Sequence, residues 1–211
     1  MRITSEEKNA TRRRIIDAAV ELFRTRGFEA TTTRDIAREA EIAVGTLFNY
    51  FDTKEAVVAS LAAEALAGAR SATAAGNNDP SSQASLEEEM FALIAAELRQ
   101  LKPLRKFITP LLESALSPLA AARRQNGAVE SLRVDHLETV AAIARRHGID
   151  EISPVSLQVY WSLYTGVLAF WSTDKSPKQE ETLALLDQSL NMFAEWLRDA
   201  AGESKQERRQ K

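Results

Sequence analysis

The sequence contains no cysteine and only two histidines among its 211 residues. Without cysteine, disulfides, thiolate metal sites and thiol nucleophiles are excluded. The two histidines, His136 and His147, are too few for a histidine-rich metal site and leave little scope for histidine-based catalysis. The sequence also has neither a glycine-rich phosphate loop nor paired carboxylates at metal-binding spacing. We therefore expect a protein that is not an enzyme and that holds no metal and no cofactor.

The chain also lacks a long apolar run. No stretch reaches the roughly 18 residues of a membrane span, and the start, MRITSEEKNATRRR, has no apolar core of the kind found in signal peptides. We expect a cytoplasmic protein with no membrane partner.

An excess of positive charge is missing as well. The formal net charge is −3, and residues 1–55 contain ten Lys or Arg and ten Asp or Glu. Bulk charge therefore gives no indication of nucleic-acid binding, which has to be judged from where the basic residues lie.

The pattern that is present is helical. Between the glycines and prolines, apolar residues recur at helical rather than strand spacing. Residues 74–83 are typical of a loop, and 202–211 are expected to form a disordered tail. The sequence predicts an all-α fold, with helices at about 9–26, 34–40, 44–50, 54–74, 85–101, 104–116, 127–147, 154–172 and 178–200.

Two short helices near the N-terminus are separated by only three residues, 41–43, and follow a longer amphipathic helix. This order is typical of a helix-turn-helix packed on a supporting helix, whose last helix enters the major groove of DNA. Leu47 and Phe51 are expected to face inward. The small Gly45 permits close approach to DNA, and the Tyr50 hydroxyl and Lys54 ammonium can bind phosphate oxygens.

The residues in this region carry a family resemblance. The stretch TTTRDIAREAEIAVGTLFNYFDTKEAVV (Thr31–Val58) resembles the DNA-binding domain of TetR-family transcriptional regulators, and ATRRRIIDAAVELFRTRGFEA (Ala10–Ala30) resembles the first helix of that family. The resemblance implies a DNA-binding domain at 9–69, with reader helices at about 33–51, and a larger helical ligand-binding and dimerisation domain at 70–201. Matching the motif position by position implies DNA contacts from Thr33, Arg34, Ala43, Val44, Gly45, Thr46, Phe48, Asn49, Tyr50 and Lys54.

Some residues depart from the family pattern. Glu41 stands where the family has a turn glycine, so a residue other than glycine is expected at positive φ, and Ala43 replaces a hydroxyl-bearing helix cap. Because these departures leave fewer side chains that can donate to phosphates, we expect base contacts from Val44 and Asn49 to contribute more to DNA binding. Other readings remain open: Phe48 and Tyr50 as core aromatics, Arg12–Arg14 as a solvated helix face, and Lys54 as an ordinary lysine at a helix start.

The last helix carries apolar residues on two faces. Leu183, Leu186, Leu190, Phe193 and Leu197 are spaced three and four apart, whereas Leu185, Met192 and Trp196 form a second face. This pattern predicts a four-helix interface between two copies of the chain, which the TetR resemblance also implies; a monomeric bundle that hides both faces is the alternative. The expected dimer interface comprises Leu157, Tyr164, Leu168, Trp171, Leu183, Leu186, Leu190, Phe193 and Leu197.

A mostly apolar ligand pocket is expected between the helices of the second domain. Single aromatic residues at helical spacing are more often core than pocket, and His136 is more readily read as a satisfied or surface histidine than as a ligand contact. The candidate lining residues are Phe91, Phe107, Leu111, His136, Gln158, Trp161 and Tyr164.

Together these features predict a DNA-binding transcriptional regulator. The favoured form is a homodimeric repressor that a small apolar effector releases from a palindromic, double-stranded operator. A constitutive or protein-partnered DNA-binding factor without a small-molecule ligand is the alternative.

Overall fold

The structure is a computed structural model that describes residues 4–76, 84–116 and 127–209. All regular secondary structure in these residues is helical, which confirms the all-α prediction. The chain forms two compact units, Met1–Ala62 and Ala63–Lys211. The division falls within helix α4, a few residues before the predicted boundary at 69/70. Residues 77–83 of the predicted loop lie outside the described part of the chain.

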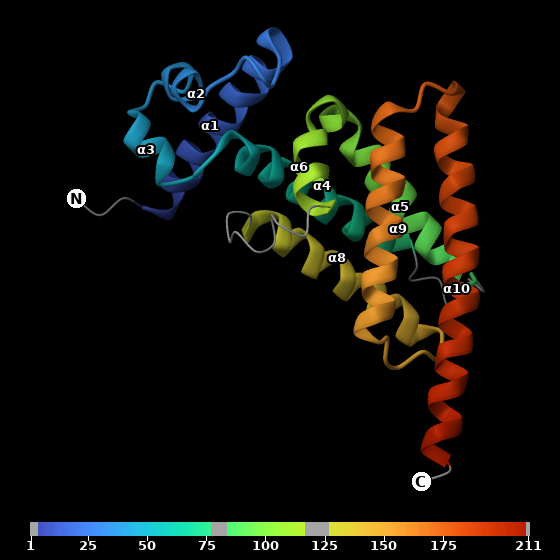
Figure 1. Cartoon of the computed structure of the whole chain (residues 1–211). Coiled ribbons are helices and arrows are strands. Elements are labelled where there is room, and N and C mark those ends of the chain that lie inside the picture. The colour runs from blue at the N-terminus through green and yellow to red at the C-terminus, as the bar shows by residue number, and fades with distance from the viewer. Residues whose placement is uncertain (1–3, 77–83, 117–126, 210–211) are drawn as a thin grey trace. The chain divides into compact units, whose positions relative to one another are not determined.

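The N-terminal unit consists of α1 (Ser5–Arg26), α2 (Thr33–Glu39), α3 (Val44–Phe48) and the beginning of α4 (Lys54–Gly76) (Figure 1). Helix α1 starts before the predicted Asn9 because Thr4 and Glu7 form a capping box. The Thr4 hydroxyl accepts a hydrogen bond from the Glu7 amide at 3.2 Å, and the Glu7 carboxylate accepts from the Thr4 amide at 2.8 Å. Helix α1 is amphipathic, as predicted, and its buried side comprises Ile15, Ile16, Ala19, Leu22 and Phe23.

The C-terminal unit contains the rest of α4 and the helices that follow it. They are α5 (Leu86–Leu101), the 3-10 helix η1 (Lys102–Phe107), α6 (Thr109–Leu116), α8 (Gly127–Arg146), α9 (Pro154–Thr173), the 3-10 turn η2 (Pro177–Gln179) and α10 (Glu180–Arg209). The single helix predicted at 104–116 is interrupted at Ile108, which separates η1 from α6.

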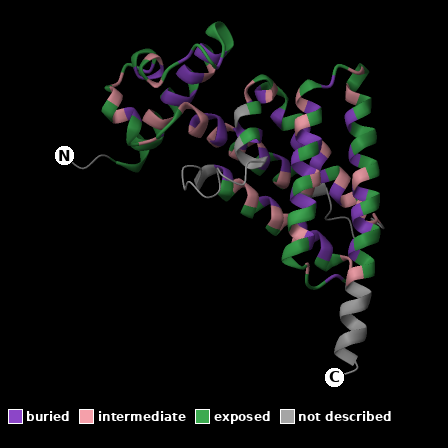
Figure 2. Ribbon diagram, in the orientation of Figure 1, coloured by how far each residue is buried: buried purple, intermediate pink, exposed green. Residues whose placement is uncertain are grey.

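The core of this unit lies where α10 packs against α5 and α9, and where α9 packs against α6 and α8. Helices α9 and α10 run side by side (Figure 1), and each presents one buried and one exposed side (Figure 2). Ion pairs add to the apolar packing: Arg198 on α10 contacts Glu87 on α5 at 2.6 Å, and Arg146 on α8 contacts Glu89 at 2.5 Å. In the described residues, no helix combines the length and apolar character needed to cross a membrane.

The end of the chain differs from the prediction. Helix α10 continues through Arg209, so the expectation of a disordered tail at 202–211 is corrected for residues 202–209. Extending an existing helix adds a backbone hydrogen bond per residue without a new nucleation step. The Glu, Lys, Gln and Arg residues of this segment favour helix enough to offset the single glycine, which costs about 1 kcal/mol relative to alanine.

Candidate nucleic-acid interface

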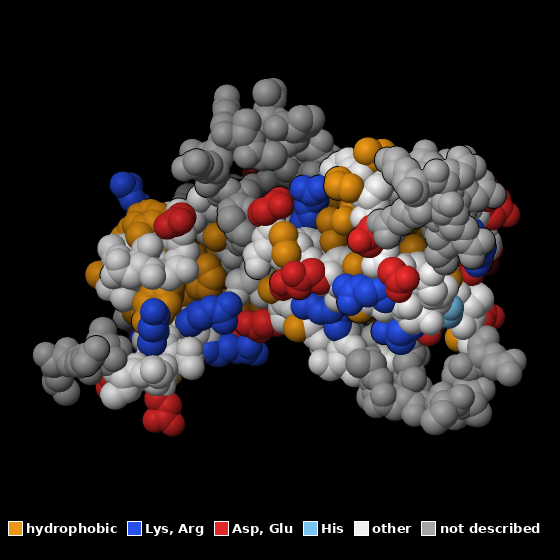
Figure 3. Space-filling model, turned by 90° about the horizontal axis from the view of Figure 1, so that it is seen from below, with side chains coloured by type: hydrophobic (Ala, Val, Ile, Leu, Met, Phe, Trp, Pro, Cys, Tyr) orange, Lys and Arg blue, Asp and Glu red, His pale blue; other side chains and the backbone are white. Residues whose placement is uncertain are grey.

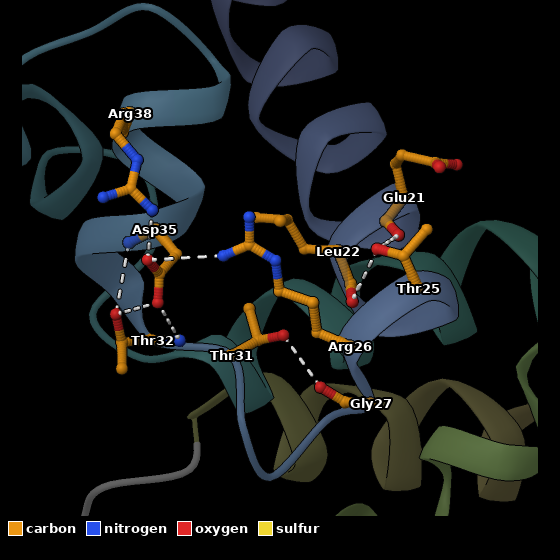
Figure 4. Close-up of polar contacts among 9 residues, drawn as sticks. All are labelled: Glu21, Leu22, Thr25, Arg26, Gly27, Thr31, Thr32, Asp35 and Arg38. Atoms are coloured by element: carbon orange, nitrogen blue, oxygen red, sulfur yellow. Dashed lines mark hydrogen bonds and ion pairs between the residues drawn. The ribbon is translucent and has the colours of Figure 1, made fainter.

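A network of hydrogen bonds around Asp35 fixes the start of α2 (Figure 4). Its carboxylate accepts from the Thr32 hydroxyl at 2.6 Å and from the Thr32 amide at 3.1 Å, while the Thr32 hydroxyl caps the helix. Arg38 binds the same carboxylate at 2.5 Å, and Arg26 of α1 lies 3.8 Å from it. The bonds from the Thr32 hydroxyl and amide, followed by the charge and hydrogen bond of Arg38, lower the pKa of the Asp35 carboxyl.

The turn between α2 and α3 confirms the expectation for Glu41. Its φ is 53°, in the left-handed region that glycine usually occupies in such turns. The turn is closed by a hydrogen bond from the Ile42 amide to the Ala37 carbonyl at 2.9 Å. Ala43 then caps α3 without a side-chain hydrogen bond, as its methyl group dictates.

Helix α3 has a clear inner and outer face. Leu47 and Phe51 are buried, as predicted, and anchor the helix on the N-terminal unit. Phe48 is 46% exposed, so the reading of this ring as a core aromatic is wrong. Of the other predicted contact residues on the two reader helices and just after them, Ala43, Gly45 and Asn49 are exposed, and Thr33, Val44, Thr46 and Tyr50 are half-buried.

Packing inside the protein does not require a glycine at position 45, as it does not at Gly68 or Gly166. A Cβ atom at this position would meet no atom within 4 Å, and the residue lies within a helix. Glycine is unfavourable in helices, by roughly 0.5–1 kcal/mol relative to alanine. What distinguishes Gly45 is its place at the start of α3, the helix that the helix-turn-helix order places in the DNA groove, where a missing side chain permits close approach.

Lys54 does not simply point into solvent. Its Nζ donates hydrogen bonds to the carbonyl oxygens of Phe28 at 2.7 Å and Glu29 at 3.3 Å, and lies 4.3 Å from the centre of the Phe28 ring. The ammonium thus holds the α1–α2 loop. The resemblance implied a phosphate contact for Lys54, and the alternative was an ordinary lysine at a helix start. Neither interpretation predicted that Lys54 holds this loop.

Arginine side chains surround the helix-turn-helix. Predicted Arg34 is exposed, and Arg38, one turn later on the same side of α2, was missed although its spacing from Arg34 was visible in the sequence. Arg12 is not a merely solvated residue, because it donates to the Ser60 hydroxyl and lies 5.7 Å from the centre of the Phe51 ring. Lysine and arginine side chains are interspersed with apolar ones over the N-terminal part of the chain (Figure 3), as a surface that binds both phosphates and base edges requires.

This geometry agrees with comparisons to known families. The family of bacterial regulatory proteins described as the tetR family matches residues 15–61, and the tetracyclin repressor-like C-terminal domain matches residues 89–206. The chain belongs to the TetR family. It is a transcriptional regulator and not an enzyme, which confirms both predictions.

Sequence similarity to two characterised regulators covers part of the chain. The transcriptional repressor KstR2 of Rhodococcus jostii is 47% identical over 51 residues, which cover 24% of this chain and 25% of KstR2. The regulator UidR of Escherichia coli is 36% identical over 55 residues, covering 26% and 28% of the two chains. This chain thus matches about a quarter of the length of these relatives.

Solved structures extend the similarity to the whole fold. FadR of Thermus thermophilus, a TetR-family repressor solved with lauroyl-CoA, superimposes with a TM-score of 0.68 at 24% identity, over 87% of this chain and 93% of FadR. FadR of Bacillus subtilis, solved with stearoyl-CoA, gives a TM-score of 0.56 at 20% identity, over 86% and 96% of the two chains. These likenesses establish a shared TetR architecture.

The predicted dimer interface requires a correction. Most of its residues are buried within a single protomer, where α10 packs on α5 and α9, and so cannot meet a second copy. Leu183 remains exposed and Leu157 half-buried. The predicted interface residues that are instead core are Tyr164, Leu168, Trp171, Leu186, Leu190, Phe193 and Leu197.

The predicted pocket residues come together only in part. His136, Trp161 and Tyr164 are buried neighbours, with the His136 and Tyr164 rings stacked 4.0 Å apart. Gln158 is exposed and accepts a hydrogen bond from Arg133 at 2.9 Å, so its expected role inside the pocket is wrong. Phe91 and Phe107 are half-buried, and Leu111 is buried on α6.

A small apolar hollow, with room for about one water molecule, lies among α5, α9 and α10. Of the predicted residues only Tyr164 lines it, and tertiary packing supplies the others. Its lining consists of Ile94, Tyr160, Leu163, Tyr164, Val167, Leu186, Ser189 and Leu190.

Proposed function

We propose that this TetR-family protein is a homodimeric repressor that binds a palindromic operator and is released by a small effector with an apolar body. The observation that carries the DNA-binding part is the outer face of α3. It exposes a large ring at Phe48 and a glycine at Gly45 that the protein's own packing does not require, and the cap residue Asn49 exposes an amide beside them. Val44 and Asn49 are placed to contact a thymine methyl group and an adenine edge, respectively.

Dimerisation is supported by the second apolar face of α10 and its counterpart on α9. Met192 and Val155 are 59% and 66% exposed, a large apolar surface for a soluble monomer. The exposed Gly166 lies on α9, and a Cβ there would meet no atom within 4 Å, which leaves room for a partner helix. Two copies joined at this face form a four-helix bundle about a two-fold axis. The proposed interface, replacing the predicted one, comprises Val155, Val159, Phe170, Leu185, Met192 and Trp196.

A two-fold dimer presents two α3 helices to DNA. Half-sites one helical turn of DNA apart, ~34–36 Å, match such a symmetric pair, so we expect a palindromic operator. We expect the protein in the cytoplasm, where the DNA lies. An effector that binds more tightly to a dimer whose two α3 helices have a different spacing shifts the population away from the operator-binding form.

The effector part is supported by the C-terminal unit. Two structural neighbours were solved in complex with acyl-CoA molecules, one with lauroyl-CoA and the other with stearoyl-CoA. In this chain only a small apolar hollow lies among helices α5, α9 and α10 of the described residues, so an effector with an apolar body requires these helices to move apart. We infer an effector with an apolar body rather than acyl-CoA specifically, since low sequence identity transfers the fold alone.

Selection of bound DNA from a random pool tests this function. We expect an enriched inverted repeat, bound by a species that light scattering shows to be a dimer. A monomer at micromolar concentration, or an enriched site without two-fold symmetry, would overturn the model. Thermal-shift screening then separates a ligand-responsive repressor from a constitutive one, because a ligand that binds only the folded state raises Tm.

A further inference from the structure

Two arginine side chains meet at one carboxylate oxygen in the N-terminal unit (Figure 4). Arg38 of α2 donates to Asp35 Oδ1 at 2.5 Å, and Arg26, in the last turn of α1, lies 3.8 Å from the same atom. The other oxygen, Oδ2, accepts from the hydroxyl and the amide of Thr32. Asp35 is therefore held through both of its oxygens, and it joins the end of α1 to the start of α2.

Both arginines remain exposed in spite of these contacts. The side chains of Arg38 and Arg26 are 69% and 52% exposed, whereas that of Asp35 is only 20% exposed. A guanidinium group has five N–H donors, and Arg38 uses one of its terminal nitrogens to bind Asp35, so donors remain for another acceptor. Two cations and one carboxylate also leave a net positive charge, which favours an anion as that acceptor.

Arg38 shares one exposed side of α2 with Arg34. The two residues are four positions apart and are therefore neighbours on the helix surface, whereas Ile36 and Ala37 form the buried side. The exposed Glu39 projects about 100° further round the helix, on a different side from this pair. In a helix-turn-helix the first helix crosses the DNA backbone while the second enters the major groove. The side of α2 that carries the two arginines can thus meet phosphate groups.

We propose that Arg38 binds a phosphate of the operator backbone and that Asp35 is a positioning residue, which holds the Arg38 guanidinium in place in the absence of DNA. The inference rests on the proposed function, to which it adds a contact and the residue that orients it. A side chain that is already ordered loses less entropy on binding, which corresponds to a roughly two- to tenfold gain in affinity. Arg26 offsets the charge of Asp35, which reduces the repulsion between this carboxylate and the phosphate.

Arg38→Ala tests the phosphate contact on the operator that selection from a random DNA pool provides. We expect affinity to fall for operator and unrelated DNA alike. The slope of log affinity against log salt concentration should become smaller by about one for each protomer that binds. Arg38→Lys keeps the charge and should keep the wild-type slope.

Arg24→Ala is the matched control. Arg24 also pairs with an acidic residue three positions before it, Glu21, and its side chain is likewise 69% exposed, but it lies on α1, outside the helix-turn-helix. Its salt slope should equal that of the wild type. An unchanged slope for Arg38→Ala, or an equal reduction in both alanine variants, overturns the phosphate contact. If selection enriches no DNA, it is the proposed function that fails instead.

Asp35→Asn tests the positioning role. A neutral amide holds a guanidinium less firmly, so operator affinity should fall about threefold, while the salt slope stays that of the wild type because Arg38 still neutralises its phosphate. In the Arg38→Ala background, Asp35→Asn should cause no further fall, since it acts through Arg38. A rise in affinity for Asp35→Asn, or an equal fall with and without Arg38, overturns the positioning role.

Circular dichroism and Tm of each variant separate these effects from a loss of structure. Asp35→Asn weakens the bonds to Thr32 that cap α2, so its Tm should fall. Arg38 is mostly exposed, and Arg38→Ala should keep the helical spectrum. The Arg38 variants therefore decide the phosphate contact even if Asp35→Asn does not fold. A fall in Tm for Arg38→Ala with unchanged operator affinity would assign Arg38 a structural role alone and overturn the proposal.

Discussion

The Lys54 ammonium, at the start of α4, donates a 2.7 Å hydrogen bond to the carbonyl oxygen of Phe28, 26 residues earlier in the chain. The same ammonium lies over the Phe28 ring, and Phe28 packs against Phe23 with ring centres 5.0 Å apart. One cation thereby joins α4 to the loop that precedes the helix-turn-helix. Its first role in this structure is to hold the DNA-binding unit together.

Replacing Lys54 by Met should therefore lower the stability of the protein. Hydrogen bonds from a charged donor to two carbonyl groups are lost, and we expect a cost of about 1–2 kcal/mol. Operator affinity should fall to a similar extent for all sequences, without a change in its salt dependence. Denaturant unfolding and operator titration at several salt concentrations measure both effects, with the exposed Lys8→Met as the control. Unchanged stability with a salt slope smaller by about one would identify Lys54 as a phosphate contact instead.

Gly45→Ala should separate folding from DNA binding. A methyl group at this position meets no protein atom within 4 Å, so stability should stay the same or rise by up to about 1 kcal/mol. Operator affinity should drop about tenfold or more, because the methyl group holds α3 away from the groove. Gly68→Ala on α4 is a matched control, since a Cβ there also meets nothing within 4 Å. Equal operator affinity for the two variants would show that DNA does not approach Gly45.

The two faces of α10 should respond differently to a negative charge. Leu190 is buried in the protomer, and Leu190→Glu should destabilise the fold by about 3–5 kcal/mol because it buries an unpaired charge. Met192 lies on the exposed face, so Met192→Glu should retain the helical circular dichroism spectrum while dissociating the dimer and weakening operator binding. Light scattering and circular dichroism on both variants make the comparison. A dimeric Met192→Glu protein would exclude this face as the interface.

The turn between α9 and α10 should lose stability in acid through Asp174. Its carboxylate accepts hydrogen bonds from the Thr182 hydroxyl at 2.5 Å and from the amides of Ser176 and Thr182 at 2.7 and 3.1 Å. These bonds, led by that from the Thr182 hydroxyl, lower its pKa from 3.8 to about 2. Because the folded-state pKa is depressed, the stabilisation is complete above the ordinary pKa and disappears as pH falls from about 4 to about 2.

Thermal unfolding of wild type and Asp174→Asn across this pH range tests the expectation. The wild type should have the higher Tm at neutral pH, and the difference should shrink between about pH 4 and about pH 2. Asp150→Asn, which removes the same charge from an exposed position, is the control. A Tm difference between wild type and Asp174→Asn that stays constant down to about pH 2 would show that the carboxylate charge is not what stabilises the turn.

Local patterns were sufficient for much of the fold and of the DNA-binding unit. Apolar periodicity located the helices, the turn signals located most of their ends, and the spacing around Gly45 identified the helix-turn-helix before any coordinates. Leu47 on α3 and Phe51 just after it face inward as predicted, and Glu41 adopts the positive φ that its position requires. These features depend on residues within a few positions of one another, where sequence carries the information directly.

The tertiary structure decided which helix of the chain covers each apolar face. The sequence alone showed that α10 has two apolar faces, but not that α5, far earlier in the chain, covers the one containing Leu190. It likewise could not show that Lys54 bonds to Phe28, or that His136 bonds to both Glu97 and Tyr160 in the core. The physical reason is that helical periodicity determines which residues share a face, whereas long-range packing determines what that face contacts.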